Sequence, residues 1–343
     1  MIHEESGNLL RAEVEALVNT VNTVGVMGKG VALQFKQAFP ENFRTYAKAC
    51  KSGEVRIGRM FVTRTGSFMP RLIINFPTKT HWQGNSKLEH IETGLADLVR
   101  VVRDERIRSI AIPALGCGLG GLRWEDVFPL IQTAFATMPD VEVHVYPPGQ
   151  VIAPEDEVVN TPKPAMTAWR AALIRIVDAY RVLGGDATHL EAQKLIYFLV
   201  HAGEPLKTNF SKHAFGPYDA NIRYALQSMN GHYVYGFGDG SKFEPVRLKD
   251  GALDEANRFL RQGSDPSADA RIERVIDLID GFETPYGLEL LATVHWVVTQ
   301  EGAATLDQII ERVSEWNDRK QRIMEPRHLK IAYAQLRDRG WLP

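Results

Sequence analysis

The first half of the chain alternates between two patterns of apolar residues. Short apolar runs bounded by turn residues are typical of buried strands, whereas apolar residues spaced three and four positions apart are typical of helices. The expected strands are residues 14–19, 59–64, 71–75, 107–112 and 142–145, and the expected helices are residues 31–48, 87–102 and 124–138. This alternation predicts an α/β domain in which helices flank a mixed, largely buried central sheet.

The second half of the chain differs, because helical spacing dominates it. The expected helices are residues 173–182, 190–200, 253–262, 272–279, 288–298, 306–316 and 328–339. Two segments rich in Gly, Phe and Tyr, residues 208–218 and 232–247, are expected to form short strands and loops. The sequence therefore predicts a mainly α-helical second domain with a few short strands.

A proline-rich segment separates the two patterns. Five prolines and an acidic triplet lie between residues 147 and 164. Because proline has no N–H group and a fixed φ angle, such a segment forms neither a helix nor a central strand. We therefore expect a first domain over residues 1–147, a linker over residues 148–164 and a second domain over residues 165–343.

Composition narrows the class of protein. Of the 343 residues, 44% are hydrophobic and 24% are charged, which is ordinary for a protein with two globular domains. No apolar run is long enough for a membrane span, and early acidic residues are unlike a signal peptide. The two cysteines, Cys50 and Cys117, fit a reducing compartment and not a cysteine-rich zinc site. We expect a cytoplasmic protein with no membrane partner, no metal and no cofactor.

Two glycine-rich loops carry the clearest chemical signal. Residues 25–30 read Gly-Val-Met-Gly-Lys-Gly, and residues 116–121 read Gly-Cys-Gly-Leu-Gly-Gly. Each loop follows an expected strand and precedes an expected helix, a layout that lets backbone N–H groups close around a phosphate. Two such loops at the carboxyl ends of two strands predict one ligand with more than one phosphate.

The second loop also fits the glycine pattern of dinucleotide-dependent oxidoreductases. In that fold the loop belongs to the first strand–helix unit, and an acidic residue ends the next strand. Here the loop comes late in the domain, and Asp140 precedes the next strand. The glycine pattern therefore indicates a phosphate cradle without the rest of that fold.

Lys79 follows the expected central strand 71–75 and is expected in a loop, because Pro77 stops strand pairing. Ligands of open α/β sheets bind at this carboxyl edge. The lysine could act as a nucleophile, hold a phosphate by its charge, or be an idle surface residue. His81 and Trp82 beside it could stack on a nucleobase or form an aromatic cap on the domain.

Other polar side chains near the loops also have two interpretations. Asn19, Asn22 and Thr23 lead into the first loop, where they could hold its backbone or contact a sugar hydroxyl. Four arginines with interspersed aromatic residues could form a track for single-stranded DNA or be ordinary strand-face residues. These arginines are Arg56, Arg59, Arg64 and Arg71.

The order of these motifs resembles the macrodomain family of ADP-ribose-binding modules. The resemblance covers residues 1–147 and rests on Gly-Asn-Leu-Leu at 7–10, on residues 18–23 and on both glycine loops. The string over residues 19–35, with Asn-Phe-Pro-Thr-Lys at 75–79, is more specific. It is similar to the lysine-bearing DarG branch of macrodomain hydrolases. Those proteins are antitoxins that remove ADP-ribose from thymidine bases in DNA after modification by the toxin DarT.

The resemblance implies a role for each motif. Lys79 would be catalytic, Asn8 and Leu9 would lie near the adenine, and Asn22 would contact the distal ribose. The implied ADP-ribose site comprises Asn8, Leu9, Asn19, Asn22, Thr23, Gly25, Val26, Met27, Gly28, Lys29, Gly30, Thr78, Gly116, Cys117, Gly118, Leu119, Gly120, Gly121 and Leu122. One position departs from the pattern, because some related lysine-bearing enzymes have an aspartate where this chain has Gly120.

The resemblance also implies a reaction. The substrate would be ADP-ribosylated single-stranded DNA, and the N-glycosidic bond between the ribose and thymine would be hydrolysed. Lys79 would either attack the anomeric carbon or polarise the departing base. The alternative is a non-catalytic ADP-ribose-binding macrodomain whose antitoxin role is sequestration of the toxin only.

The second half has a resemblance of its own. Residues 190–200 and 210–219 are similar to the SocA-like domains, also called Panacea domains, which occur in antitoxins and bind partner toxins. Residues 165–343 would then hold the DarT toxin directly. Phe210, Phe215 and Tyr218 could equally belong to the core of the helical domain. Nothing in the sequence implies a homo-oligomer.

Overall fold

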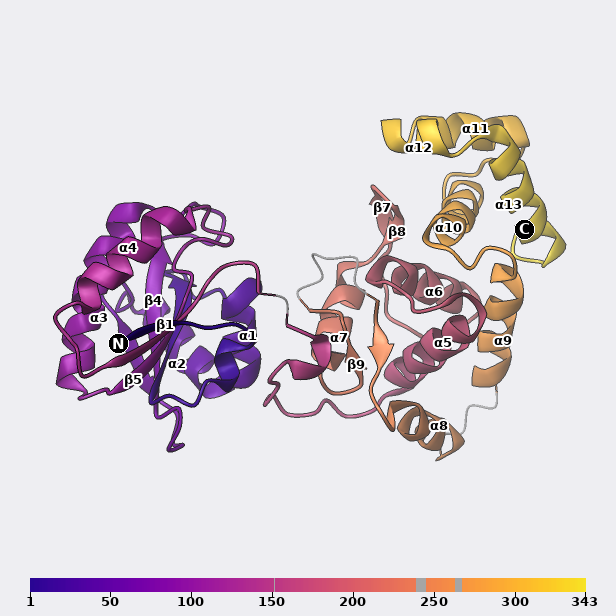
Figure 1. Ribbon diagram of the computed structural model, residues 1–343. Helices are drawn as coiled ribbons and strands as arrows, with labels where there is room; N and C mark the ends of the chain where they lie inside the picture. Colours follow the sequence, from indigo (N-terminus) through magenta and orange to yellow (C-terminus); the bar gives the residue numbers. More distant parts are fainter. Residues whose placement is uncertain (151, 239–244, 263–266) are drawn as a thin grey trace. The chain divides into compact units, whose positions relative to one another are not determined.

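The computed structural model describes residues 1–150, 152–238, 245–262 and 267–343. These residues form two compact units, Met1–Pro162 and Lys163–Pro343 (Figure 1). The division falls inside the proline-rich segment that the sequence predicts as a linker, of which residue 151 lies outside the described residues. Within the described ranges no helix has the length and apolar character needed to cross a membrane.

The first unit is built on a six-stranded sheet. Its strand order is β1 (Ile2–Glu4), β6 (Glu142–Tyr146), β5 (Ser109–Pro113), β2 (Ala16–Asn22), β4 (Leu72–Lys79) and β3 (Phe61–Arg64). All neighbouring pairs are parallel except β3 with β4. The predicted mixed central sheet is therefore confirmed.

Helices cover both faces of this sheet, as Figure 1 shows. They are α1 (Gly30–Ala38), α2 (Pro40–Lys51), α3 (Leu88–Asp104) and α4 (Trp124–Phe135), with a short 3-10 turn η1 (Leu9–Arg11). Alternate strand residues face opposite layers. Val18 and Ile74 pack in the cluster that includes α3 and α4, whereas Leu17 and Ile73 pack in the cluster that includes α1.

Two predicted elements of this unit end elsewhere in the structure. The expected helix 31–48 is two helices, because Phe39 leaves helical geometry and Pro40 begins α2. The expected strand 71–75 continues through Pro77 to Lys79. The neighbouring strand β3 begins at Phe61, opposite Asn75, so the β3-facing edge of β4 is unpaired beyond that point and tolerates a proline.

The segment after β6 packs back onto the first unit. It contains the 3-10 turn η2 (Pro154–Asp156). The side chain of Asn160 donates a hydrogen bond of 2.8 Å to the carbonyl oxygen of Ala38 at the end of α1. The side chain of Asn8 donates one of 2.8 Å to the carbonyl oxygen of Asp156. Residues 152–162, named here the return segment, thus lie against η1 and α1.

The second unit is mainly helical, as predicted. Its helices are α5 (Ala168–Gly184), α6 (His189–His201), α7 (Ala220–Met229), α8 (Ala252–Gln262), α9 (Ala268–Ile279), α10 (Pro285–Thr299), α11 (Leu306–Ser314), α12 (Asp318–Ile323) and α13 (Pro326–Asp338). The short strands are β7 (Ser211–His213), β8 (Gly216–Tyr218), β9 (Val234–Tyr235) and β10 (Arg247–Leu248). Of the expected segment 232–247, residues 239–244 lie outside the described residues.

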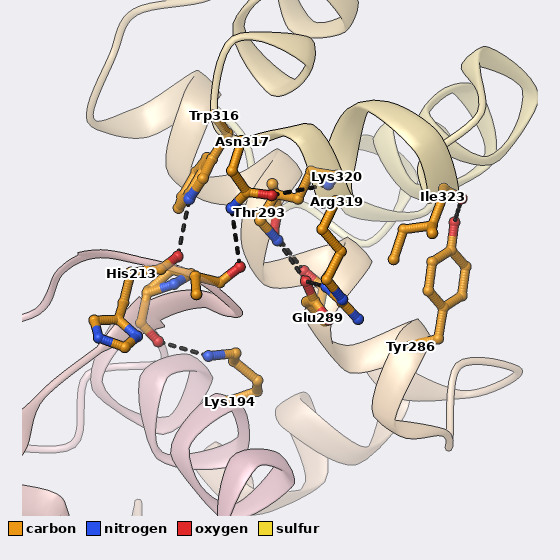
Figure 2. Close-up of polar contacts among 12 residues, drawn as sticks. Lys194, His213, Tyr286, Glu289, Thr293, Trp316, Asn317, Arg319, Lys320 and Ile323 are labelled. Carbon is orange, nitrogen blue, oxygen red and sulfur yellow. Dashed lines mark hydrogen bonds and ion pairs between the residues drawn. The ribbon is translucent and has the colours of Figure 1, made fainter.

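A buried polar cluster ties the β7–β8 hairpin to the helices around it (Figure 2). The Lys194 amine of α6 donates a hydrogen bond of 2.7 Å to the carbonyl oxygen of Pro217. The fully buried Lys320 of α12 donates to Glu289 at 2.6 Å and to Thr293 at 2.9 Å, both on α10. Burial lowers the pKa of Lys194 to about 7 and that of Lys320 to about 8.

The tip of the hairpin is held by residues that precede α12. The indole of Trp316 donates to the carbonyl oxygen of His213 at 2.9 Å, and the amide of Asn317 donates to that of Ala214 at 3.2 Å. Phe210 packs against the core of the unit, and the Arg319 guanidinium lies over the Phe215 ring. Both aromatic side chains therefore contribute to the packing of this unit itself.

Candidate functional site

Three loops of the first unit gather at one edge of its sheet. Residues 23–29 follow β2, residues 80–87 follow β4, and residues 114–123 follow β5. Strand β2 lies between β4 and β5 and is parallel to both. Because the three strands point the same way, the loops after them meet at their carboxyl ends, where α/β sheets bind ligands. Both predicted glycine loops and Lys79 lie there.

The first glycine loop is shaped by Asn22. The Asn22 side-chain oxygen accepts hydrogen bonds from the N–H groups of Val24 at 3.1 Å and Val26 at 3.2 Å. Its side-chain nitrogen donates to the carbonyl oxygen of Val26 at 2.6 Å. Gly25 has a φ of +86° and little room for a side chain beside Cys50. Asn22 therefore holds the loop, and its predicted contact with a ribose stays a prediction.

Two glycines of the second glycine loop have even less space for a side chain. Gly116 has a φ of +72°, and a Cβ atom there would meet Leu122 at 2.9 Å and Ser86 at 3.0 Å. A Cβ atom at Gly120 would overlap with both the Ser86 hydroxyl and the Gly116 carbonyl oxygen. The Ser86 side chain thus occupies the space into which an aspartate at position 120 would extend.

The loop after β4 connects the two glycine loops. The carbonyl oxygen of Thr80 accepts hydrogen bonds from both the N–H group and the hydroxyl of Thr23, at 3.2 and 2.9 Å. On the other side, the N–H group of Ser86 donates to the carbonyl oxygen of Gly120 at 2.9 Å. The three loops are therefore joined by main-chain hydrogen bonds into one structure.

Lys79 lies where these loops meet. Its amine donates a hydrogen bond of 3.0 Å to the carbonyl oxygen of Leu119 in the second loop, and its strand position pairs with Asn22 at the start of the first. Partial burial lowers the pKa of the Lys79 amine below its ordinary value. A lowered pKa increases the share of neutral amine, which is the nucleophilic form.

The side chain of Leu119 points toward the first loop. It is 64% exposed, and its Cδ1 atom lies 3.9 Å from the Cβ position of Gly30. Gly30 begins α1 and has a φ of +55°. Leu119 of the second loop therefore lies beside Gly30 at the end of the first loop, close to the positive end of the α1 dipole.

Below the first loop lies a network of buried amides. The side chain of Asn19 donates to that of Asn75 at 3.0 Å, and Asn75 donates to Asn42 of α2 at 2.7 Å. Thr63 of β3 donates to the same Asn42 oxygen at 2.7 Å. Asn42 and Ser86 were not among the predicted site residues, because only tertiary packing brings α2 and the 80–87 loop beside these strands.

The remaining predicted residues lie in several settings. Met27 and Thr78 are buried, Val26 and Lys29 are exposed, and Asn8 caps η1, in which Leu9 is buried. Burial, with a smaller effect of Glu125 and Asp126, raises the pKa of the Cys117 thiol to about 11. The thiol is therefore protonated near neutral pH, which argues against a nucleophilic cysteine.

Two of the four arginines considered as a DNA track, Arg64 and Arg71, lie away from this site. Arg64 ends β3 and forms an ion pair with Glu105, and Arg71 precedes β4 and forms one with Glu15. Because β3 is antiparallel to β4, both arginines lie at the edge of the sheet opposite Lys79. Across the described ranges, no group of three or more His, Cys, Asp or Glu side chains is arranged to hold a metal ion.

The fold and the site define the first unit as a macrodomain, and the Macro domain family model matches residues 18–131. Over its full length the chain is 50% identical to the DNA ADP-ribosyl glycohydrolase of Thermus aquaticus and covers 94% of that protein. It is 44% identical to the protein of the same name from Mycobacterium tuberculosis, over 98% of this chain and 99% of the relative. The chain therefore belongs to the DNA ADP-ribosyl glycohydrolase family, a family of hydrolases.

Two solved structures are similar in sequence to part of the chain. The macrodomain of Mycobacterium tuberculosis DarG is 59% identical, matches 43% of this chain and 99% of that one, and gives a TM-score of 0.43. Thermosipho africanus DarTG in complex with ADP-ribose is 36% identical over 41% of this chain and 40% of that one, with a TM-score of 0.40. The two full-length relatives confirm the family resemblance that the sequence predicts.

Proposed function

We propose that this chain removes ADP-ribose from thymidine bases of single-stranded DNA and so reverses the modification made by the DarT toxin. Membership of the DNA ADP-ribosyl glycohydrolase family supports the reaction. The observation that carries the proposal is the position of the Lys79 amine, 3.0 Å from the second glycine loop and beside the first. We also propose a cytoplasmic location, since the substrate is the DNA of the cell.

The glycine loops supply the binding part of this proposal. Backbone N–H groups of residues 25–30 and 116–121, with the N-terminus of α1, would surround the diphosphate. Asn8 and Leu9 would lie at the adenine end, because η1 packs on the same side of the sheet as α1. Fixing the diphosphate brings the distal ribose to Lys79 in a constant position, which lowers the entropic part of the barrier.

Two chemical roles remain for Lys79. In the first, the neutral amine attacks the anomeric carbon, and the glycosidic electron pair leaves with the thymine nitrogen, which takes up a proton. The lysine adduct opens its sugar ring to a Schiff base, and water then hydrolyses the Schiff base to free ADP-ribose and the lysine amine. In the second, the charged amine stabilises negative charge on the departing thymine without forming a bond. Borohydride reduction during turnover would trap an adduct on Lys79 in the first case only.

The direct test compares wild type with Lys79→Ala on a thymidine-containing oligonucleotide that carries ADP-ribose. We expect the variant to lose hydrolysis by at least about a hundredfold, since no other amine is held at the junction of the loops. Lys51→Ala, an exposed lysine at the end of α2, is the matched control and should keep full activity. Titration calorimetry with ADP-ribose would show whether the glycine loops of Lys79→Ala still bind the nucleotide.

The alternative is a macrodomain that binds ADP-ribose without turnover. If Lys79→Ala hydrolyses the substrate as fast as wild type does, the proposed role of the lysine is wrong. If wild type binds ADP-ribose but does not hydrolyse the substrate, the result favours the alternative. The position of the Lys79 amine at the junction of the loops favours the enzyme, because binding alone does not need an amine there.

We also propose that the second unit binds DarT. The support is a relative from Thermosipho africanus named as a DNA ADP-ribosyl transferase–DNA ADP-ribosyl glycohydrolase fusion protein, 34% identical over 43% of this chain and 42% of its own length. That protein carries the two named activities in one chain, which indicates that they act together. In the present chain a non-covalent contact would serve the same purpose.

A further inference from the structure

Trp82 and His81 form an exposed aromatic pair beside Lys79. Their ring centroids are 5.4 Å apart, and Trp82 is 49% exposed. Neither ring belongs to the apolar clusters that stabilise the first unit. The stability of the unit therefore gives no reason for a large aromatic side chain at position 82.

The backbone under this pair is held in place. The N–H group of Gly84 donates to the carbonyl oxygen of His81 at 3.0 Å, and that of Gln83 donates to the His81 ring at 3.3 Å. Thr80, just before the pair, accepts both hydrogen bonds from Thr23. The turn thus presents the two rings next to the junction of the three loops, with His81 two residues and Trp82 three residues after Lys79.

The charge of the surrounding loops suits an anionic polymer. Residues 22–30, 79–87 and 114–122 contain Lys29, Lys79 and Lys87 and no Asp or Glu. None of these lysines forms an ion pair among the described residues. The acidic side chains that follow these loops are Glu89, in the first turn of α3, and Glu125 and Asp126, in the first turn of α4. A phosphodiester backbone could therefore approach the aromatic pair without repulsion from these loops.

The reaction itself creates a need for such a surface. An enzyme that acts on a nucleobase takes it out of the stack, and the neighbouring base then loses its stacking partner. An aromatic side chain next to the reacting position can replace that partner, with little dependence on sequence.

From these observations we infer that Trp82, supported by His81, stacks on the nucleobase adjacent to the ADP-ribosylated thymidine. This inference rests on the proposed function and assigns to the site a second contact region, for the flanking single-stranded DNA. The contact raises affinity for an oligonucleotide and has no part in holding ADP-ribose or in the chemical step.

The test measures wild type, Trp82→Ala and Trp82→Phe on two substrates. One is an ADP-ribosylated thymidine within a single-stranded oligonucleotide, and the other is the ADP-ribosylated nucleoside alone. We expect Trp82→Ala to lower kcat/KM on the oligonucleotide roughly tenfold, through KM, and to leave the nucleoside rate unchanged. Trp82→Phe should recover most of the loss, because it keeps an aromatic face.

The matched control is Phe68→Ala. Phe68 is 86% exposed and lies in the turn between β3 and β4, at the edge of the sheet opposite Lys79. Replacing Phe68 by alanine should leave kcat/KM unchanged for both substrates. An equal loss on both substrates for Trp82→Ala, or no loss on the oligonucleotide, would overturn the inference. If wild type turned over neither substrate, the proposed function would fail instead, and the two failures are therefore distinguishable.

Discussion

Gly120 has no side chain, and the Ser86 side chain fills the space that one would need. Ser86 is 6% exposed, and its hydroxyl has no hydrogen-bond partner among the described residues. A side chain at position 120 would overlap with this hydroxyl. The aspartate of some related lysine-bearing enzymes thus cannot be introduced here by changing residue 120 alone.

We expect Gly120→Ala to destabilise the first unit by about 1–3 kcal/mol, because the new methyl group collides with the backbone of Gly116 as well as with Ser86. The measurement is the free energy of unfolding of the full chain in urea. Gly118→Ala is the control, since a Cβ atom at Gly118 has nothing within 4 Å. Equal stabilities of the two variants would contradict this account of the loop.

At the scale of elements, the cluster of Lys194, Lys320 and Glu289 couples the stability of the second unit to pH. Burial lowers the pKa of Lys194 from an ordinary 10.5 to about 7. Below pH 7 the lysine is protonated in both the folded and the unfolded state. The buried positive charge then raises the free energy of the folded state and lowers the free energy of unfolding. Between pH 7 and 10.5 only the unfolded state keeps the proton, so the free energy of unfolding rises with pH.

We therefore expect the urea midpoint of the second unit to rise between pH 7 and 9.5. The free energy of unfolding should increase by up to about 1.4 kcal/mol per pH unit because of Lys194. Lys194→Met should flatten the rise, and Lys330→Met, an exposed lysine on α13, should not. Tryptophan fluorescence is a suitable probe, because four of the six tryptophans lie in residues 163–343. The same slope in Lys194→Met and wild type would contradict the assignment.

The elements also show how far the sequence can predict this structure. Apolar periodicity locates most strands and helices of both units, and the glycine spacing locates both loops. The apolar periodicity misses β1, which has only three residues. It also predicts that β4 ends at Asn75, because the unpaired edge that tolerates Pro77 exists only in the assembled sheet. The overlap of Ser86 with position 120 is equally invisible in the sequence, since it joins segments that only the fold brings together.

At the scale of the whole molecule, the proposed hydrolase site and the proposed toxin-binding unit have separate cores. The residues around Lys79 lie in Met1–Pro162, and each unit has its own buried clusters. A substitution at Lys79 should therefore leave the second unit intact.

We expect full-length Lys79→Ala to form a complex with DarT as wild type does, and to protect cells when it is in excess over the toxin. It should fail to remove ADP-ribose from DNA that is already modified. Co-purification with DarT and the recovery of growth after a toxin pulse measure the two effects separately. Loss of both complex formation and protection in Lys79→Ala, with Lys51→Ala normal, would contradict binding by the second unit.

The return segment has a practical consequence for any isolated first domain. A fragment that stops at residue 147 would lack the main-chain acceptor that Asp156 offers to Asn8 and Arg11, and the contact of Asn160 with Ala38. Asn8 is proposed above to lie at the adenine end of the nucleotide. Such a shortened fragment would show a weakened affinity for ADP-ribose caused only by the place of truncation, whereas one that ends at Pro162 would keep the affinity of the full chain.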